Sequence, residues 1–284
     1  TCIDMLKKSS GINDVLNTKS NIIPGTHTEG IKEVRGEVEF RHVDFKYPGA
    51  EKNILEAITF KVEKGQTLAI IGATGSGKST LIHLIPRFFD VTSGDLLVNG
   101  RNVKDYTKEA LNNIIGLVYQ TAILFSGNIK ENIEYGENNK LALEEGELKH
   151  VANIAQASEF IEKLDDQYEA SVSQSGTNFS GGQKQRISIA RAIARRPEIL
   201  IFDDSFSALD FKTDRKLRSA LQNELKDTTK IIVAQRVGTI KDVDQIIVIE
   251  DGKVAGKGTH EDLLANNAIY REIAQSQLSE EELR

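Results

Sequence analysis

Short apolar runs alternate with polar, helix-like stretches along most of this chain. Alternation of apolar and polar positions predicts a strand over residues 37–47 and a second short strand over residues 54–62. Other apolar runs are uninterrupted and short, which is typical of strands that are buried on both faces of a parallel sheet. These runs cover residues 66–71, 199–202, 231–234 and 246–249. The pattern predicts an α/β protein with a mainly parallel sheet that is covered by helices on both faces.

Helical periods fill much of the sequence between these runs. One helix is expected to begin at Lys78, and a basic amphipathic helix is expected over residues 184–196. Acidic loops interrupt the helical periods of residues 141–168, and the segment from Glu261 onward has a polar, helical pattern. A hairpin edge is predicted at residues 96–98, because an Asn-Gly turn follows them directly.

The two ends of the chain are more polar than its middle. Residues 1–35 contain only a hint of one short amphipathic helix, and we interpret them as a connector. They lack the apolar centre of a signal peptide. Residues 276–284 are interpreted as a polar C-terminal tail, so the main domain is expected over residues 36–275.

The composition predicts a globular domain with a substantial core. The chain has 284 residues, of which 39% are hydrophobic and 27% are charged. No run of 18 apolar residues is present, so no segment is expected to span a bilayer. The net charge of −6 weighs weakly against nucleic acid as a partner. The single cysteine, Cys2, excludes an internal disulfide framework.

A glycine-rich loop fits the pattern G-x-x-x-x-G-K-[ST] between a predicted strand and a predicted helix. Its glycines permit positive φ angles and let backbone N–H groups converge on phosphate oxygens. Lys78 would bring a positive charge to the β- and γ-phosphates, and the hydroxyl of Ser79 would bind Mg²⁺. A plain turn between strand and helix is the alternative, but the complete motif favours nucleotide binding. The expected phosphate-binding residues are Gly72, Ala73, Thr74, Gly75, Ser76, Gly77, Lys78, Ser79 and Thr80.

Two carboxylates follow the apolar run at residues 199–202. Asp203 is expected at the carboxyl edge of the sheet, where α/β proteins bind ligands. It could hold Mg²⁺ through water, because this ion keeps several of its waters. Asp204 would then face the water that attacks the phosphate. The alternative is an acidic turn that caps the next helix.

A Ser-Gly-Gly-Gln turn precedes the predicted basic helix. Ser180 is a good N-cap, and the two glycines would let a phosphate of another molecule approach the helix N-terminus. Lys184 adds positive charge there, although an ordinary solvated helix face would also account for it.

The chain contains the glycine-rich phosphate loop, the sequence FSGGQKQR at residues 179–186 and the sequence IFDD at residues 201–204. With these three motifs, it resembles the nucleotide-binding domain of an ABC transporter. The resemblance covers about residues 37 to 275. It implies a P-loop NTPase (RecA-like) core, an N-terminal antiparallel β-subdomain and a helical signature subdomain at about residues 121–190. It also implies ATP and Mg²⁺ as cofactors. Two segments are similar to the exporter branch, residues 123–133 and 252–260.

The resemblance implies roles for residues outside the phosphate loop. Tyr47 would stack on adenine, although such a tyrosine taken alone is more often a packing aromatic. Gln120 would touch Mg²⁺ and couple to the membrane part. The signature, and the loop that ends at Asp210, would reach across a dimer interface to the ATP of a second domain. The signature residues are Phe179, Ser180, Gly181, Gly182 and Gln183, and the interface loop is Ser207, Ala208, Leu209 and Asp210.

The chain departs from the family pattern at the catalytic positions. Asp204 stands where the family usually has Glu, the general base, and losing one C–C bond shortens the side chain by about 1.5 Å. That can take a base out of its working range of about 2.6–3.2 Å. Gln235 stands where the family usually has His; an amide can donate a hydrogen bond but cannot become cationic. The loop at residues 172–176 also lacks the usual Glu and Arg, and Phe179 replaces the usual Leu.

Both catalytic departures weaken one site while the signature is intact, so the chain resembles the degenerate half of a heterodimeric ABC exporter. It would bind ATP at its own loop and hydrolyse it slowly, with Asp204 and Gln235 as its catalytic residues. Its signature would complete the active site of a second nucleotide-binding domain, on a different chain. The other expected partner is the transmembrane domain of the same full-length protein, at the cytoplasmic face of the cell membrane.

Three other functions remain open from the sequence. A homodimeric exporter domain could use Asp204 as its base. A soluble ABC ATPase acting on DNA or ribosomes usually carries long coiled coils or two domains in one chain, and neither is visible. A P-loop kinase would leave the signature without a role. The five histidines show no metal-ligand spacing and are interpreted as surface or packing residues; they are His27, His42, His83, His150 and His260.

Overall fold

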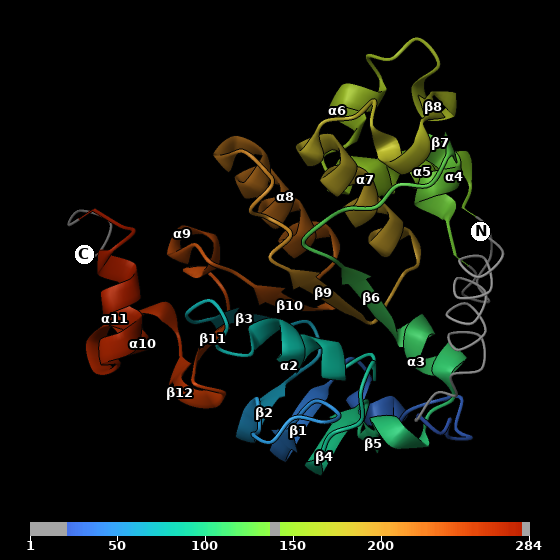
Figure 1. Cartoon of the computed structure of the whole chain (residues 1–284). Helices are drawn as coiled ribbons and strands as arrows, with labels where there is room; N and C mark the ends of the chain where they lie inside the picture. The colour runs from blue at the N-terminus through green and yellow to red at the C-terminus, as the bar shows by residue number, and fades with distance from the viewer. Residues whose placement is uncertain (1–21, 137–142, 280–284) are drawn as a thin grey trace, which may run out of the picture.

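The computed structural model describes residues 22–136 and 143–279, so the short helix predicted near the N-terminus lies outside the described residues. A six-stranded sheet runs through the middle of the domain in the order β12-β11-β3-β10-β9-β6 (Figure 1). Every neighbouring pair is parallel except β11 with β12. The strands are β3 (Thr67–Ile71), β6 (Ile115–Val118), β9 (Ile199–Asp203), β10 (Thr229–Val233), β11 (Gln245–Glu250) and β12 (Lys253–Gly258). The predicted mainly parallel sheet is confirmed.

The two edge strands of this sheet, β6 and β12, were not predicted from the sequence pattern. β6 has only four residues, and one of them is Gly116. A Cβ at Gly116 would lie 2.9 Å from Leu200 Cδ2, so the glycine permits close packing against β9. β12 reads KVAGKG and has no alternation of apolar and polar residues. Both strands are held by their neighbours in the sheet rather than by a strong local preference.

An antiparallel sheet lies beside the parallel one, in the order β2-β1-β4-β5 (Figure 1). β4 and β5 form the expected hairpin, in which Val98 pairs with Arg101. The strands are β1 (Val38–Phe45), β2 (Leu55–Val62), β4 (Ser93–Val98) and β5 (Arg101–Asn102). The N-terminal antiparallel β-subdomain is thus confirmed as part of the fold.

Helices cover both faces of the six-stranded sheet (Figure 1). α2 (Lys78–Leu84) begins at the predicted residue. α7 (Gly181–Ala194) begins before the predicted start at residue 184 and ends before the predicted end at residue 196. It ends early because Pro197 disfavours helical geometry at the residue before it, and Arg196 has φ of +48°. The longer helices are α3 (Lys108–Ile114), α5 (Glu145–Ile154), α8 (Phe211–Glu224), α10 (His260–Asn266) and α11 (Ala268–Gln275). The shorter elements are α4 (Ile129–Glu134), α6 (Ser158–Ile161), α9 (Val237–Ile240), the 3₁₀ turns Lys32–Val34, Val103–Asp105, Gln167–Glu169 and Gln174–Gly176, and the strand pair β7 (Gly127–Asn128) and β8 (Ser171–Val172).

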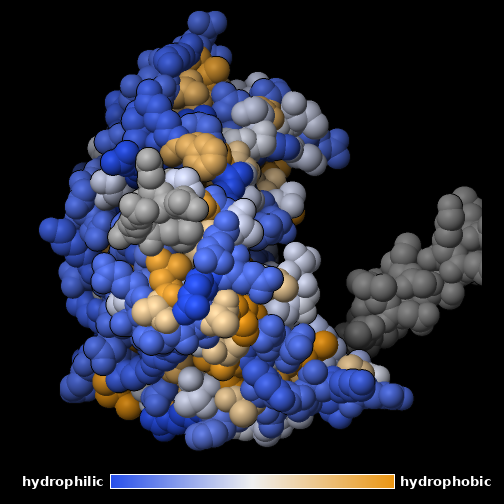
Figure 2. Space-filling view, turned by 90° about the vertical axis from the view of Figure 1, so that its left-hand side faces the viewer, coloured by the Kyte–Doolittle hydropathy of each residue, from blue (hydrophilic) through white to orange (hydrophobic). Residues whose placement is uncertain are grey.

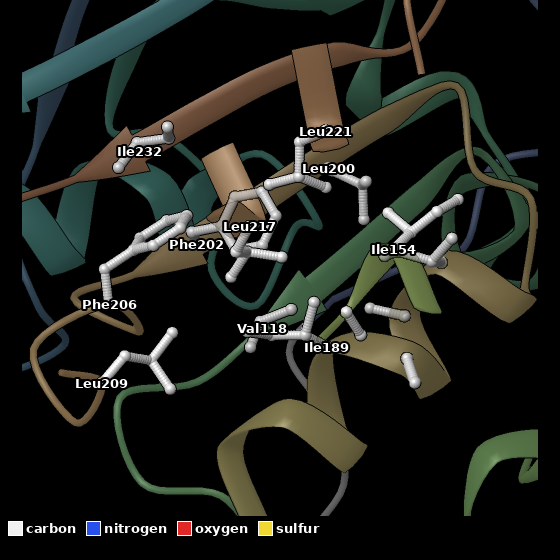
Figure 3. Close-up of a cluster of buried hydrophobic side chains, with 14 of the residues drawn as sticks. Val118, Ile154, Ile189, Leu200, Phe202, Phe206, Leu209, Leu217, Leu221 and Ile232 are labelled. Atoms are coloured by element: carbon white, nitrogen blue, oxygen red, sulfur yellow. The ribbon is translucent and has the colours of Figure 1, made fainter. Parts of the chain in front are cut away.

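Successive side chains of the parallel strands enter two different cores, as the strand period of two requires. On one face, Leu200 and Phe202 of β9 pack with Ile232 of β10 against side chains of α7 and α8 (Figure 3). On the other face, Ile199 and Ile201 pack towards α2 and the antiparallel sheet. Burial on both faces fixes the strand register and therefore the positions of the loops at the strand ends.

The described helices give no candidate for a membrane span: within residues 22–136 and 143–279, none combines the necessary length and apolar character. The proposed boundaries of the connector (1–35), the main domain (36–275), its helical part (about 121–190) and the tail (276–284) stay predictions.

Candidate nucleotide-binding site

The glycine-rich loop connects the end of β3 to the start of α2. Lys78, the first residue of α2, turns its ammonium group back over the loop. Its Nζ donates hydrogen bonds to the carbonyl oxygens of Gly72, at 2.8 Å, and Ala73, at 2.7 Å. The side chain is buried, which lowers the pKa of Lys78, while the nearby charges of Asp204 and Asp203 act in the opposite direction. The ammonium group of Lys78 is therefore held by two backbone carbonyl oxygens of the loop.

Close packing within the chain requires two of the loop glycines. A Cβ at Gly72 would lie 2.1 Å from the carbonyl oxygen of Ile249, on the neighbouring strand β11. Gly77 has φ of +102°, and a Cβ there would lie 2.8 Å from Leu55 Cδ2. The Oγ of Ser76 is buried and has no hydrogen-bond partner among the described residues. A buried hydroxyl without a partner costs free energy, so this atom fits a site that a polar ligand completes.

Ser79 and Asp203 meet beneath this loop. The Oγ of Ser79 donates a hydrogen bond of 2.9 Å to Oδ1 of Asp203, from α2 to the end of β9. His83 lies one turn further along α2, and its Nε2 is 3.3 Å from Oδ2 of Asp203. Hydroxyl and carboxylate oxygens are the ligand types that Mg²⁺ prefers, so the pair fits that ion. The interpretation of His83 as a surface or packing residue did not predict this contact, although its spacing of four residues from Ser79 on one helix was the available signal.

Asp204 is held between two amides from neighbouring strands. Its Oδ2 accepts hydrogen bonds from Nε2 of Gln120, at 2.9 Å, and Nε2 of Gln235, at 2.6 Å. These glutamines follow β6 and β10, which flank β9 in the sheet, so the carboxyl ends of three adjacent parallel strands supply the cluster. Burial and the adjacent charge of Asp203 raise the pKa of Asp204, whereas the amide hydrogen bonds lower it. The net direction is upward.

Tyr47 lies beside the helix that follows the loop. Its hydroxyl is 2.9 Å from Oγ1 of Thr80. Its ring packs edge-on against Phe45, at 4.9 Å, and Phe89, at 5.1 Å between ring centroids. The tyrosine thus packs against aromatic neighbours and also borders the phosphate loop. Its stacking on adenine stays a prediction, as does contact of Gln120 with a metal ion.

The signature is built by a capping box at the start of α7. The Oγ of Ser180 accepts a hydrogen bond from Gln183 N, and Oε1 of Gln183 accepts one from Ser180 N, which explains their spacing within the chain. Gly181 has no such explanation, because a Cβ there would meet no atom within 4 Å. At Gly182 a Cβ would lie 3.2 Å from the carbonyl oxygen of Ala208. Asp210 caps α8 by accepting hydrogen bonds from N and Oγ1 of Thr213.

The structure therefore gathers the predicted residues into two groups. The phosphate loop, Asp203, Asp204, Gln120 and Gln235 converge at the carboxyl edge of the sheet. The signature and the loop ending at Asp210 lie together, since Gly182 approaches Ala208. Throughout the described part of the chain, no hydrogen bond joins residues 180–183 to residues 72–80.

Comparison with known proteins agrees with this geometry. Residues 55–207 match the family described as ABC transporter, which is more than half of the chain. An ABC transporter ATP-binding protein of Mycobacterium tuberculosis is 44% identical over 94% of this chain and 46% of its own length. A Staphylococcus aureus protein named for multidrug export, as an ATP-binding/permease protein, is 45% identical over 88% of this chain and 43% of its own length.

A solved structure extends the comparison to three dimensions. A bacterial Atm1-family ABC exporter with ATP bound superimposes with a TM-score of 0.87 at 33% identity, over 97% of this chain and 48% of that chain. The chain belongs to the ABC transporter family, and it is a nucleotide-binding ATPase domain of the exporter type. The family predicted from the motifs is confirmed. The chain spans about half the length of the curated relatives that it matches.

Proposed function

We propose that this chain binds ATP with Mg²⁺ at its own phosphate loop and pairs head to tail with a second nucleotide-binding domain on a different chain. Together the two domains would drive export of a substrate across a membrane from its cytoplasmic face. In this arrangement the chain's own site hydrolyses ATP slowly, and its signature completes the active site of the partner. The observation that carries the proposal is the arrangement around Asp204.

Asp204 is poorly arranged to act as a general base. Its side chain is one bond shorter than the Glu usual in this family, and its Oδ2 already accepts hydrogen bonds from Gln120 and Gln235. A base must reach its proton donor within about 2.6–3.2 Å. Two competing donors on one oxygen, together with the shorter reach, disfavour proton abstraction from water. Gln235 itself cannot carry the positive charge that His can carry.

The residues present fit ATP and Mg²⁺. Ser79 and Asp203 offer two oxygens at the position where the metal would lie, and Lys78 and the loop amides would hold the β- and γ-phosphates. When bound, Mg²⁺ would neutralise part of the charge on the phosphate oxygens. The unpartnered Oγ of Ser76 supports a polar ligand here.

The open space around Gly181 supports a partner domain at the signature. A glycine at the start of a helix has no advantage in conformation over Ser or Asn unless something must approach closely. Nothing within the described chain approaches this glycine. A phosphate group bound to a second domain could use the α7 N-terminus and its unpaired N–H groups.

An apolar groove supports docking of a transmembrane domain. It has a volume of about 510 Å³ and lies beside the segment that carries Gln120. The rings of Phe125 and Tyr135 stack at 4.2 Å in its wall, and the guanidinium of Arg191 lies over both of them. Exposed apolar surface of this kind marks an interaction site. The large exposed side chains that line it are Phe88, Tyr119, Ile123, Phe125 and Tyr135.

Turnover of MgATP tests the slow site. The chain alone is expected to hydrolyse ATP well below the range of about 1–100 s⁻¹ that is typical of kinases. In an assembled heterodimer, the double substitution Asp204→Glu with Gln235→His is expected to raise hydrolysis at this chain's own loop, because it restores both the reach of the base and a group that can become cationic. Fast turnover by the unaltered chain, or no gain in the double variant, would contradict the proposal.

Mixing and fractionation separate the remaining alternatives. Stimulation of ATP hydrolysis by a different partner chain, and none by a second copy of this chain, would support the heterodimer over a homodimeric exporter. Gradient fractionation of the native full-length product should place it with membranes. Recovery with ribosomes or DNA instead would favour a soluble ABC ATPase.

A further inference from the structure

Gln277, just beyond the last helix, contacts the loop that carries Gln235. Its Nε2 donates a hydrogen bond of 2.8 Å to the carbonyl oxygen of Gln235, and its Oε1 accepts one of 2.8 Å from the backbone N–H of Val237. A carbonyl can only accept and a backbone N–H can only donate, so the two contacts fix the orientation of the Gln277 amide. One side chain therefore holds both sides of the turn at Arg236.

Besides Gln277, this turn is held by a hydrogen bond of 3.2 Å from the N–H of Thr239 to the carbonyl oxygen of Arg236, and the Arg236 guanidinium lies over the ring of Phe211. Gln235 and Arg236 are exposed, whereas the residues on either side, Ala234 and Val237, are buried. Val237 begins α9, and the N-cap residue Arg236 makes no side-chain capping hydrogen bond. The N–H of Val237 is one of the unsatisfied donors at a helix N-terminus, and Gln277 supplies its acceptor. A residue 40 positions away thus serves as the cap.

The segment that carries Gln277 is itself firmly held. Tyr270 and Ala274 of α11 are fully buried, and the hydroxyl of Tyr270 lies 2.7 Å from Nδ1 of His260. The backbone N–H groups of Gln277 and Leu278 both donate to the carbonyl of Ala274, at 3.1 and 2.9 Å. Figure 2 views the side of the molecule that carries α10 and α11, and its surface is mostly hydrophilic with small apolar patches. Gln277 is therefore positioned by the buried side chains beneath it.

We propose that Gln277 is a positioning residue of the nucleotide site, which acts by holding the 235–237 turn so that the Gln235 amide reaches Asp204. The chain of contacts runs from Gln277 to the backbone of the turn, and from Nε2 of Gln235 to Oδ2 of Asp204 at 2.6 Å. The short segment after α11 thereby belongs to the site. The consequence for turnover rests on the proposed function, whereas the contact itself does not.

NMR of the ¹⁵N-labelled 284-residue chain, without nucleotide, tests the positioning directly. In Gln277→Ala, the side-chain amide signals of Gln235 are expected to move towards those of a free glutamine, and exchange of the Val237 amide hydrogen should quicken about tenfold, as loss of one hydrogen bond implies. Gln277→Glu separates the two contacts: its carboxylate can still accept from Val237 N but cannot donate to the Gln235 carbonyl. It should keep the Val237 amide protected and still move the Gln235 signals.

Two control variants separate positioning from general stability. Phe60→Leu removes a buried aromatic side chain of β2, which stacks on Phe40 in the other core, so it should lower the melting temperature and leave the Gln235 signals in place. Gln275→Ala changes an exposed glutamine of α11, the helix that precedes Gln277, and should alter neither. Unmoved Gln235 signals in Gln277→Ala, or equal movement in Phe60→Leu, would overturn the inference.

Turnover in the assembled heterodimer gives the functional test. At this chain's own loop, Gln277→Ala should raise kcat severalfold and leave KM for MgATP within about twofold, since it frees one oxygen of Asp204 from a competing donor and acts on the reaction rather than on binding. Gln277→Ala should add nothing to Gln235→Ala, because it acts through that residue. Additive effects would overturn the inference. Fast turnover by the unaltered chain would instead contradict the slow-site proposal and leave the NMR result to decide the role of Gln277.

Discussion

The phosphate loop and the signature are both glycine-rich turns that begin a helix, but the surroundings of their glycines differ. At the loop, a Cβ at Gly72 would lie 2.1 Å from a backbone carbonyl oxygen of the same chain, and Gly77 has φ of +102°, which disfavours any side chain. At the signature, Gly181 faces open space. The loop's shape is therefore required by the fold that surrounds it. Gly181 meets no such constraint within the described chain, which fits the proposed close approach of a partner domain.

The largest expected effect comes from Gly181→Ala. A methyl group at this position would block close approach of a partner's phosphate, so ATP turnover at the partner's site should fall about 10²-fold, the scale of losing one stabilising donor. Turnover in an assembled heterodimer, with the partner's site as the active one, measures this. Urea unfolding of the isolated chain is the control and should not change. Unaltered turnover would show that the signature glycine serves no partner.

Next in size is Lys78→Met, which keeps the apolar stem but removes the charge. Affinity for MgATP at this chain's own loop should fall about 10- to 100-fold, because hydrogen bonds to charged groups contribute about 1.5–3 kcal/mol. Titration calorimetry measures the affinity. Lys184→Met, in the first turn of the signature helix, is the matched control and should leave that affinity unchanged. Equal losses of MgATP affinity in both variants would contradict the proposal that this chain binds its own ATP at the phosphate loop and not at its signature.

Gly72→Ala tests the loop as a packing site. Because a Cβ there would lie 2.1 Å from the carbonyl of Ile249, the backbone must shift, and overpacking of this kind costs about 1–3 kcal/mol. Urea unfolding should show this loss in the free energy of unfolding. Gly181→Ala, measured in parallel, should show none. A stable Gly72→Ala variant would mean that the loop is more adaptable than its contacts indicate.

The smallest expected effect concerns charge. The pKa of Asp204 is raised by burial and by Asp203, so the stability that Asp204 contributes is complete below the ordinary value of 3.8 and is lost as pH rises through the raised value. Asp204→Asn should therefore be more stable than the unaltered chain at neutral pH, by about 1 kcal/mol, and the gain should vanish as pH falls towards 3.8. Thermal unfolding across this pH range measures the gain.

Asp210, near the signature, gives the opposite case. Hydrogen bonds from Thr213 lower its pKa, so its contribution to stability is present above the ordinary value and is lost as pH falls through the lowered one. Asp210→Asn should bring no gain at neutral pH, since Asn caps a helix about as well as Asp. A gain at Asp210 equal to that at Asp204 would contradict the attribution of the Asp204 effect to its burial and to repulsion by Asp203.

Strong local patterns predicted most of the fold. The buried strands β3, β9, β10 and β11 and the helix after the phosphate loop lie where the apolar runs and the glycine motif indicated. β6 and β12 could not be predicted, because four residues with a glycine and a lysine-rich edge strand carry little pattern of their own. β6 pairs with β9, which lies more than eighty residues further along the chain, and β12 pairs with β11, from which only a turn separates it.

The candidate site divides in the same way. The loop, Asp203, Asp204 and the signature form contiguous motifs, so the sequence was enough to propose them as site residues. The contacts of His83 and Gln277 were missed. Gln277 touches the backbone of Gln235 and Val237, and a contact with backbone atoms leaves no motif in the sequence. Such contacts depend on where two distant segments pack, which composition and spacing do not express.

The sequence by itself determined the chemistry that this domain carries: a phosphate-binding loop, two adjacent carboxylates and a capped signature helix, each encoded by neighbouring residues whose local geometry makes the feature. Only the tertiary structure decided how these groups meet. The parallel order of β10, β9 and β6 brings Gln235 and Gln120 to the same oxygen of Asp204. The docking of α11 brings Gln277 to the backbone of Gln235 and Val237, because buried side chains of α11 fix the position of that helix.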